Sequence, residues 1–260
     1  MDNGLTNTQI EQFIRDGFVR IDNAFPADDA QTVREILWQE LPGTPDDPTT
    51  WTQPVIRLGM YNQGPFVRAA NTAVLHRAFD QLVGAGRWIP CQSMGTFPVR
   101  FPSALDPGDT GWHVDASFPG ADPADYVAWR INFRSRGRAL LMLFLFSDCS
   151  EQDAPTRIRI GSHLNVASLI KEAGEEGLSF MELAGKLHEL PEQNEVVAVG
   201  KAGTVYLCHP FLVHASQPHR GTEPRFLAQP PLLLRGELCI EGSPTGYMPV
   251  EAAIRLGLRL

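Results

Sequence analysis

From about residue 88 onward, the chain is a series of short apolar or alternating segments separated by glycine, proline and aspartate. The run 139–146 (ALLMLFLF) is apolar throughout, which is typical of a strand buried on both faces. Further strands are expected at 156–160, 195–199, 204–208 and 225–234, and one helical insertion at about 166–187 interrupts them. Many short strands with one helical interruption favour a sandwich or jelly roll over alternating β-α units.

The first 87 residues carry a helical pattern instead. Apolar residues at helical spacing predict helices that end near Gly17 and that span about 28–41 and 71–83, with a short extended segment at 18–21. We therefore expect one domain over residues 1–260 that is mainly β with flanking helices. Residues 1–87 would give mainly helical support to a jelly-roll core formed by residues 88–260.

Charge and composition narrow the class of protein. The formal net charge of −8 argues against a general nucleic-acid surface, which is normally basic. The longest apolar run has eight residues, so it is too short to span a bilayer, and the first residues do not resemble a signal peptide. The four cysteines form no CxxC pair. We expect a cytoplasmic protein that binds neither nucleic acid nor membrane and is a monomer or homodimer.

A His-x-Asp pair in the segment 111–115 (GWHVD) is the first candidate for chemistry. On an extended strand the side chains of His113 and Asp115 point the same way, so both can reach one metal ion. His214 is the candidate third ligand. Two histidines and one carboxylate on one face of an octahedral ion leave three positions open, an arrangement that suits non-haem Fe(II) oxygenases. Such a pair also arises by chance, and a lone histidine is more often bonded to backbone inside the core.

Arg225, eleven residues after His214, strengthens the metal hypothesis. If His214 ends one strand and Arg225 begins the next, their side chains reach the same cavity. A guanidinium binds a carboxylate through two parallel hydrogen bonds, as the distal carboxylate of 2-oxoglutarate requires. Ser216 would share the face of His214 and donate to the same carboxylate. Alone, Arg225 would more often form a surface salt bridge.

His113-x-Asp115, then about a hundred residues, then His214-x-Ser216 and Arg225, resembles the phytanoyl-CoA dioxygenase family, which includes ectoine hydroxylase. The segment 16–22 (DGFVRID) and the Gly-Ser-His turn at 161–163 are also similar to that family. The resemblance implies a double-stranded β-helix, Fe(II), 2-oxoglutarate and O₂. It implies His113, Asp115 and His214 as metal ligands, with Arg225 and Ser216 on 2-oxoglutarate. The reaction implied is decarboxylation of 2-oxoglutarate to succinate with hydroxylation of a substrate C–H bond.

The chain departs from the family before the Gly-Ser-His turn, where it reads DAPTRIRI over 153–160. Relatives more often have Asn-Gly early in this stretch and Pro just before the turn. Within it, Thr156 is expected to face the cofactor. Because Asp115 is retained, halogenation, which some relatives with a small residue there perform, is not expected. His209 is a rival for His214, but the match to His-x-Ser and the spacing to Arg225 favour His214 and leave His209 as a buried structural histidine. His219 is expected in solvent.

A cluster of arginines follows the metal segment. Arg130 and Arg134, with Trp129, either form a lid that binds an anionic substrate or lie in a solvated loop. Arg136 and Arg138 are expected to be solvated residues leading into the apolar strand. The leading functional hypothesis is hydroxylation, or a related C–H oxidation, of a small metabolite. A cupin-type metal-dependent hydrolase or isomerase with the same ligands would have no need of Arg225 and Ser216. A binding protein without turnover is the third alternative, and the intact ligands argue against it.

Overall fold

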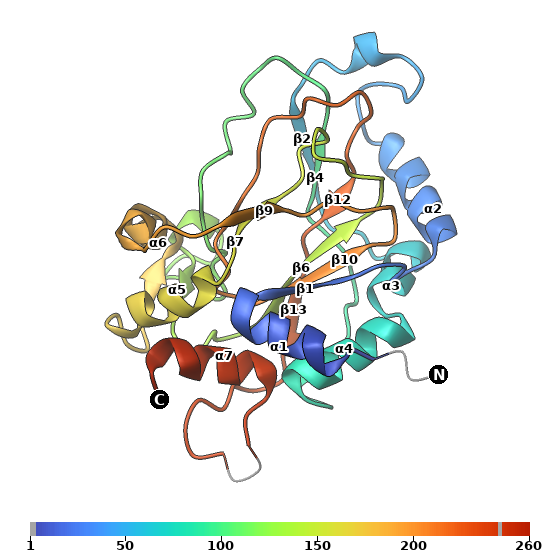
Figure 1. Cartoon of the computed structure of the whole chain (residues 1–260). Helices are drawn as coiled ribbons and strands as arrows, with labels where there is room; N and C mark the ends of the chain where they lie inside the picture. Colours follow the sequence, from blue (N-terminus) through green and yellow to red (C-terminus); the bar gives the residue numbers. More distant parts are fainter. Residues whose placement is uncertain (1–3, 244–245) are drawn as a thin grey trace.

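A six-stranded antiparallel sheet forms the centre of the molecule in this computed structural model, which describes residues 4–243 and 246–260 (Figure 1). Its strands follow the order β1 (Phe18–Ile21), β10 (Val205–Cys208), β6 (Arg138–Leu145), β13 (Pro231–Leu234) and β3 (Trp88–Ile89), and β12 (Leu227–Ala228) also pairs with β6. Every residue of β6 is buried, as the apolar run that starts at residue 139 predicts for all of them but Arg138. The β1 strand, which comes from the N-terminal part of the chain, completes one edge.

A three-stranded sheet packs against one face of the large sheet. It contains β11 (His214–Ala215), β7 (Arg157–Arg159) and β9 (Glu195–Val197). One hydrophobic cluster joins the two sheets, because Leu141, Leu143 and Leu145 of β6 share it with Ile158 of β7. Two smaller pairs, β2 (Val55–Leu58) with β4 (Phe97–Arg100) and β5 (Arg130–Ile131) with β8 (Leu178–Ser179), extend this sandwich.

Helices cover the other face of the large sheet. The intervening residues of β6, Leu140, Met142 and Phe144, belong to the larger core cluster together with residues of the helices. The helices are α1 (Asn7–Asp16), α2 (Ala27–Trp38), α3 (Gly64–Ala70), α4 (Ala73–Val83), α5 (Ser162–Lys171), α6 (Phe180–Lys186) and α7 (Pro249–Leu258), with 3-10 turns η1 (Pro48–Thr50), η2 (Tyr126–Ala128) and η3 (Leu187–Glu189). In Figure 1, α1, α4 and α7 lie together below the sheet, and α7 packs against both of the others.

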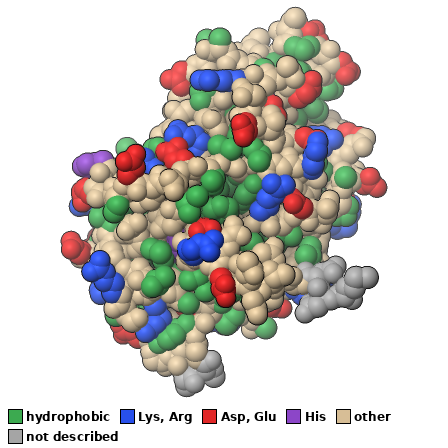
Figure 2. Space-filling model, viewed as in Figure 1, with side chains coloured by type: hydrophobic (Ala, Val, Ile, Leu, Met, Phe, Trp, Pro, Cys, Tyr) green, Lys and Arg blue, Asp and Glu red, His purple; other side chains and the backbone are tan. Residues whose placement is uncertain are grey.

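The predicted class, mainly β with flanking helices, is confirmed, and some boundaries differ. The segment 225–234 forms two strands, β12 and β13, because Pro230 and Pro231 have no N–H to continue the ladder. Helices α3 and α7 were not predicted. No helix among the described residues combines the length and apolarity that crossing a membrane requires. On the face shown in Figure 2, Lys and Arg side chains alternate with Asp and Glu instead of forming a basic patch.

Two buried histidines lie where α1 meets α5 and the end of β10. Gly17 ends α1 with φ 88°, as predicted, and a Cβ there would lie 2.5 Å from Nδ1 of His163. The Nε2–H of His163 donates to the carbonyl of Ile14 at 3.0 Å, and its ring centroid is 4.8 Å from that of His209. Burial lowers the pKa of His163 to about 4, and burial lowers that of His209 well below its usual value. Both imidazoles are therefore neutral at pH 7.

We expect these histidines to make the protein acid-labile. A histidine whose pKa is lower in the folded state stabilises the fold fully above pH 6.5, and this contribution is lost as the pH falls towards 4. For His163 the loss amounts to roughly 3 kcal/mol, a large part of a typical domain stability. Urea unfolding at pH 7 and pH 5 should show roughly 2 kcal/mol of this loss, because pH 5 lies about 1.5 units below the ordinary pKa of 6.5. His163→Gln, which stays neutral and keeps a donor, should reduce the difference, whereas equal wild-type stability at both pH values would contradict the expectation.

Candidate metal centre

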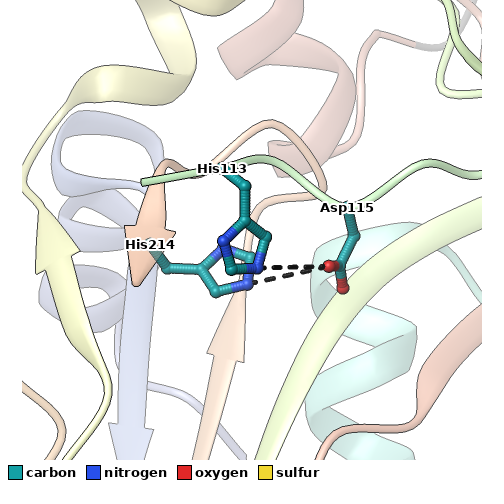
Figure 3. Close-up of side chains that lie close together, drawn as sticks. All are labelled: His113, Asp115 and His214. Atoms are coloured by element: carbon teal, nitrogen blue, oxygen red, sulfur yellow. Dashed lines mark ion pairs between the residues drawn. The ribbon is translucent and has the colours of Figure 1, made fainter. Parts of the chain in front are cut away.

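The side chains of His113, Asp115 and His214 converge on one point (Figure 3). Nε2 of each histidine lies 3.8 Å from Oδ1 of Asp115. One potential ligand atom from each residue lies within 4.8 Å of the other two. Among the described residues this is the one cluster of three or more His, Cys, Asp or Glu side chains with such spacing.

Backbone pairing positions the two histidines. The N–H of His113 donates to the carbonyl of His214 at 2.9 Å, and the N–H of His214 donates back at 3.0 Å. His113 thereby extends the edge of the small sheet, where His214 in β11 already pairs with Ile158 of β7. The segment around Asp115 is irregular and not the strand that the sequence predicts. The carboxylate reaches the histidines nevertheless.

Both imidazoles present Nε2 as the free nitrogen. The Nδ1–H of His113 donates to the carbonyl of Gly111 at 2.9 Å, and that of His214 donates to the carbonyl of Leu212 at 3.0 Å. Each bond fixes the tautomer and turns the Nε2 lone pair towards Asp115. Burial lowers the pKa of His214 to about 4, so this ring is neutral near pH 7, as metal ligation requires.

Arg138, at the start of β6, holds the third member of the cluster. Its guanidinium donates to Oδ2 of Asp115 at 2.7 Å, which leaves Oδ1 facing the histidines. Burial, the largest single influence, would raise the pKa of Asp115, but the charge and hydrogen bond of Arg138 and the two neighbouring histidines together outweigh it and hold the pKa well below its usual range. The expectation that Arg138 is solvated was therefore wrong, because only 7% of the residue is exposed.

The three residues fit a divalent metal ion. Nε2 of His214 is buried and has no hydrogen-bond partner among the described residues, which is costly unless another group satisfies it. Two imidazole nitrogens and one carboxylate oxygen form the 2-His-1-carboxylate donor set of non-haem Fe(II) sites. The side chain of His113 is 24% exposed and that of Asp115 19%, so the cluster opens on one side towards solvent.

The residues expected to bind the cosubstrate lie beyond His214. The hydroxyl of Ser216 donates to the main-chain carbonyl of Asp109 at 2.6 Å and lies 3.0 Å from Oδ1 of the same residue. Arg225 is buried, and its guanidinium donates to the carbonyls of Ala154 and, at 3.2 Å, Pro98. Thr156 is also buried, directly before β7. Their contact with 2-oxoglutarate stays a prediction.

The residues expected to bind substrate tie two segments of the chain together. Arg130 donates to the carbonyls of Glu176 at 2.9 Å and Gly177 at 2.7 Å, and Arg134 pairs with Glu175 at 2.6 Å. The indole N–H of Trp129 donates to the carbonyl of Pro123 at 2.9 Å. The contacts of Arg130 and Arg134 fasten the segment 118–134 to the segment that leads into α6, and that of Trp129 lies within the first segment. A substrate contact by Arg130, Arg134 or Trp129 stays a prediction.

Two aromatic residues that sequence reasoning missed stand beside the cluster. The ring centroid of Phe180 is 5.5 Å from that of His113, and Tyr126 lies 6.2 Å from Phe180. Burial of the phenol group, with the nearby charge of Asp115, raises the pKa of Tyr126 to about 12, so the hydroxyl is protonated at neutral pH. The ring of Tyr126 is partly exposed, and it links the cluster to the molecular surface.

His209 and His219 lie outside the metal cluster. His209 is buried, accepts a hydrogen bond from the N–H of Phe211 at 3.1 Å and lies outside the cluster, which agrees with the structural role predicted for it. His219 is 4% exposed, so the prediction that it is solvated was wrong. The N–H of Gly221 donates to its Nδ1 at 3.1 Å, which closes the polar loop over the ring.

We expect Arg138→Gln to weaken metal binding about 10- to 100-fold, because partners that orient a metal ligand contribute that much to affinity. Titration with Ni(II), followed by calorimetry, measures the change. Arg136→Gln is the matched control, since its guanidinium lies over the ring of Phe118, 5.2 Å from the centroid, and does not contact Asp115. Equal affinities in the two variants would show that Arg138 does not position the carboxylate.

Comparison with known proteins identifies the fold. The sequence model of the family described as phytanoyl-CoA dioxygenase (PhyH) matches residues 13–227. No curated protein sequence matches the chain. The structure is similar to the non-heme alpha-ketoglutarate-dependent carbocyclase SnoK from nogalamycin biosynthesis, with 17% identity over 88% of this chain and 84% of that chain and a TM-score of 0.55.

Two further solved structures are similar. One is EctD from S. alaskensis with 2-oxoglutarate and 5-hydroxyectoine, with 20% identity over 88% of this chain and 76% of that chain and a TM-score of 0.55. The other is HygX from Streptomyces hygroscopicus with nickel and 2-oxoglutarate bound, with 18% identity over 94% of this chain and 90% of that chain and a TM-score of 0.53. These likenesses confirm the predicted jelly roll with flanking helices.

Proposed function

The chain belongs to the phytanoyl-CoA dioxygenase family, and on that premise we propose that it oxidises a C–H bond of a small metabolite with Fe(II), 2-oxoglutarate and O₂. The overall change is 2-oxoglutarate + O₂ + R–H → succinate + CO₂ + R–OH. The observation that carries the proposal is the convergence of His113, Asp115 and His214, with both Nε2 atoms and one carboxylate oxygen free to bind a metal ion. EctD and HygX, which have similar folds, were solved with 2-oxoglutarate.

In this proposal the protein positions the reactants. His113 and His214 would hold the ion through Nε2, because their Nδ1–H groups are engaged by backbone. Asp115 would hold it through Oδ1, since Arg138 engages Oδ2. When bound, Fe(II) and 2-oxoglutarate would activate O₂, and O₂ would supply the oxidising power for the substrate C–H bond. Arg225, Ser216 and Thr156 would bind the keto acid on the side of the site formed by β7 and the strands that follow it.

We place the substrate beside Phe180 and Tyr126. These rings extend from His113 towards the exposed side chains of Val127 and Met181. Arg130, Arg134 and Trp129 would act as a lid by holding the segment that carries Tyr126 against α6. An apolar wall of this kind suits a small molecule with an apolar or aromatic part.

An anaerobic titration tests the proposal. Fe(II) and 2-oxoglutarate added to the purified protein should give a weak visible charge-transfer band, and admission of air should yield succinate. A cupin-type hydrolase or isomerase with the same ligands would give neither signal. Absence of both the band and succinate would rule out the proposed function.

A further inference from the structure

Two buried arginines, Arg100 and Arg225, lie opposite each other on paired backbone segments, and Asp109 links the first of them to Ser216. Arg100, at the end of β4, and Arg225 exchange backbone hydrogen bonds of 3.1 and 2.8 Å. Side chains of directly opposed residues in antiparallel strands lie on the same face and close together. Each residue is only 2% exposed. Two like charges placed opposite each other in the interior destabilise the fold unless anions compensate them.

One carboxylate compensates only part of this charge. Asp109 accepts from Nη2 of Arg100 through both of its oxygens at 2.7 Å, and it also contacts Arg57. Among the described residues, Asp109 is the one carboxylate within ion-pair distance of any of the guanidinium groups of Arg57, Arg100 and Arg225, and it pairs with the first two. Arg225 has no ion-pair partner there, since its bonded acceptors are the neutral carbonyls of Ala154 and Pro98. Three cations therefore share one anion.

Several buried donors of this cluster lack acceptors. Nε and Nη1 of Arg100 and Nε of Arg225 have no hydrogen-bond partner in the described part of the chain. Nε2 of His219 is also without one, and it carries the ring proton because Nδ1 accepts from Gly221. Arg225 and Arg100 both lie close enough to His219 to lower its pKa, which burial already lowers. Buried N–H groups and an excess of positive charge together call for a multivalent anionic acceptor.

The cluster connects directly to the candidate metal centre. Ser216, two residues after His214, donates to Asp109, and Asp109 in turn binds Arg100. An anion at the arginine pair would therefore lie on the Ser216 side of the metal ligands. 2-Oxoglutarate, which binds a metal through its keto-acid end, carries at its other end a carboxylate, the kind of group that the unpartnered arginine donors can bind.

We propose that Arg100 is a second positively charged anchor, beside Arg225, for the distal carboxylate of 2-oxoglutarate. The inference rests on the proposed function and extends it, because it assigns the choice of keto acid to an arginine pair oriented by Asp109. Arg100 and Arg225 together make the site strongly selective for a 2-oxo acid with a second carboxylate. Asp109 holds Nη2 of Arg100, and the free Nε and Nη1 groups face the ligand.

The test compares two keto acids that differ only at the far end. 2-Oxoglutarate has a carboxylate at C5, whereas 2-oxopentanoate has a methyl group there. Calorimetry on the Ni(II)-loaded protein measures both affinities without turnover. Arg100→Met should weaken 2-oxoglutarate about 10- to 100-fold, as expected for the loss of a charge-assisted hydrogen bond, and 2-oxopentanoate less than about 3-fold. The matched control is Arg57→Met, which removes an exposed charge from the same Asp109 and should leave the selectivity nearly unchanged.

The outcomes separate this inference from the proposed function. If Arg100→Met leaves the ratio of the two affinities unchanged, Arg100 is not an anchor. If the wild-type protein binds no 2-oxoglutarate, the proposed function itself fails. If Arg100→Met does not fold, Arg100→Lys, which keeps the charge but loses the planar donors, replaces it in the same comparison of the two affinities. A several-fold loss of selectivity in Arg100→Lys supports the anchor, and an unchanged ratio overturns it.

Discussion

Asp115→Ala is expected to weaken metal binding by more than about 100-fold and to abolish succinate formation. Changes in residues that merely orient a metal ligand already cost up to that factor, and Asp115 would be a ligand itself. The variant also leaves Arg138 without its carboxylate, so we expect the metal-free protein to lose about 2 kcal/mol of its free energy of unfolding. Calorimetric titration with Ni(II) and urea unfolding without metal measure the two effects separately.

A double variant distinguishes the two consequences. Asp115→Ala with Arg138→Met removes both charges of the pair, so stability should recover while metal binding stays lost. Asp115→Asn, which is nearly isosteric, should preserve most of the stability and still bind metal poorly. Wild-type metal affinity in Asp115→Ala would show that the His113–Asp115–His214 cluster is not the metal site.

Arg225→Met is expected to raise the dissociation constant of 2-oxoglutarate about 10- to 100-fold while leaving metal affinity within about 3-fold. Removal of one partner of a buried charge-assisted pair costs about 1.5–3 kcal/mol, which corresponds to this factor. The side chain of Met fills much of the space, which limits the cavity left by the guanidinium. Calorimetry on the Ni(II)-loaded protein measures both constants.

Arg20→Met is the control for a general effect of removing positive charge, since Arg20 pairs with Asp22 on the surface and its side chain is 39% exposed. It should not change either constant. A 2-oxoglutarate dissociation constant that is the same in Arg225→Met as in the wild type would rule out the anchoring role.

Local patterns predicted the scaffold well. Apolar and alternating runs indicated β1, β6, β7, β9 and β10, because burial on one or both faces leaves a period in the sequence. The same reasoning failed at 225–234, where the run of apolar residues concealed two prolines that split the strand. Short strands such as β3 and β5 carry too few residues to show any period.

The site was predictable only where its residues follow a spacing rule. His113 and Asp115 were found from their separation, and His214 from its distance to Arg225. The roles of Arg138 and Arg100 were not found from the sequence. Their partners, Asp115 and Asp109, lie on irregular segments that approach these arginines only in the folded chain. The local sequence around an arginine next to an apolar strand is the same whether the side chain is solvated or buried. The distinction depends on tertiary contacts that a local pattern does not contain.

The backbone bridge between His113 and His214 has a consequence for biosynthesis. It joins residues about a hundred positions apart, so the two imidazoles meet only after the intervening chain has folded back. A nascent chain cannot form the complete His113–Asp115–His214 cluster until residue 214 has left the ribosome. A metal ion that needs all three ligands would therefore not guide the early steps of folding. It would stabilise the finished sandwich, with a gain that grows with the concentration of free metal.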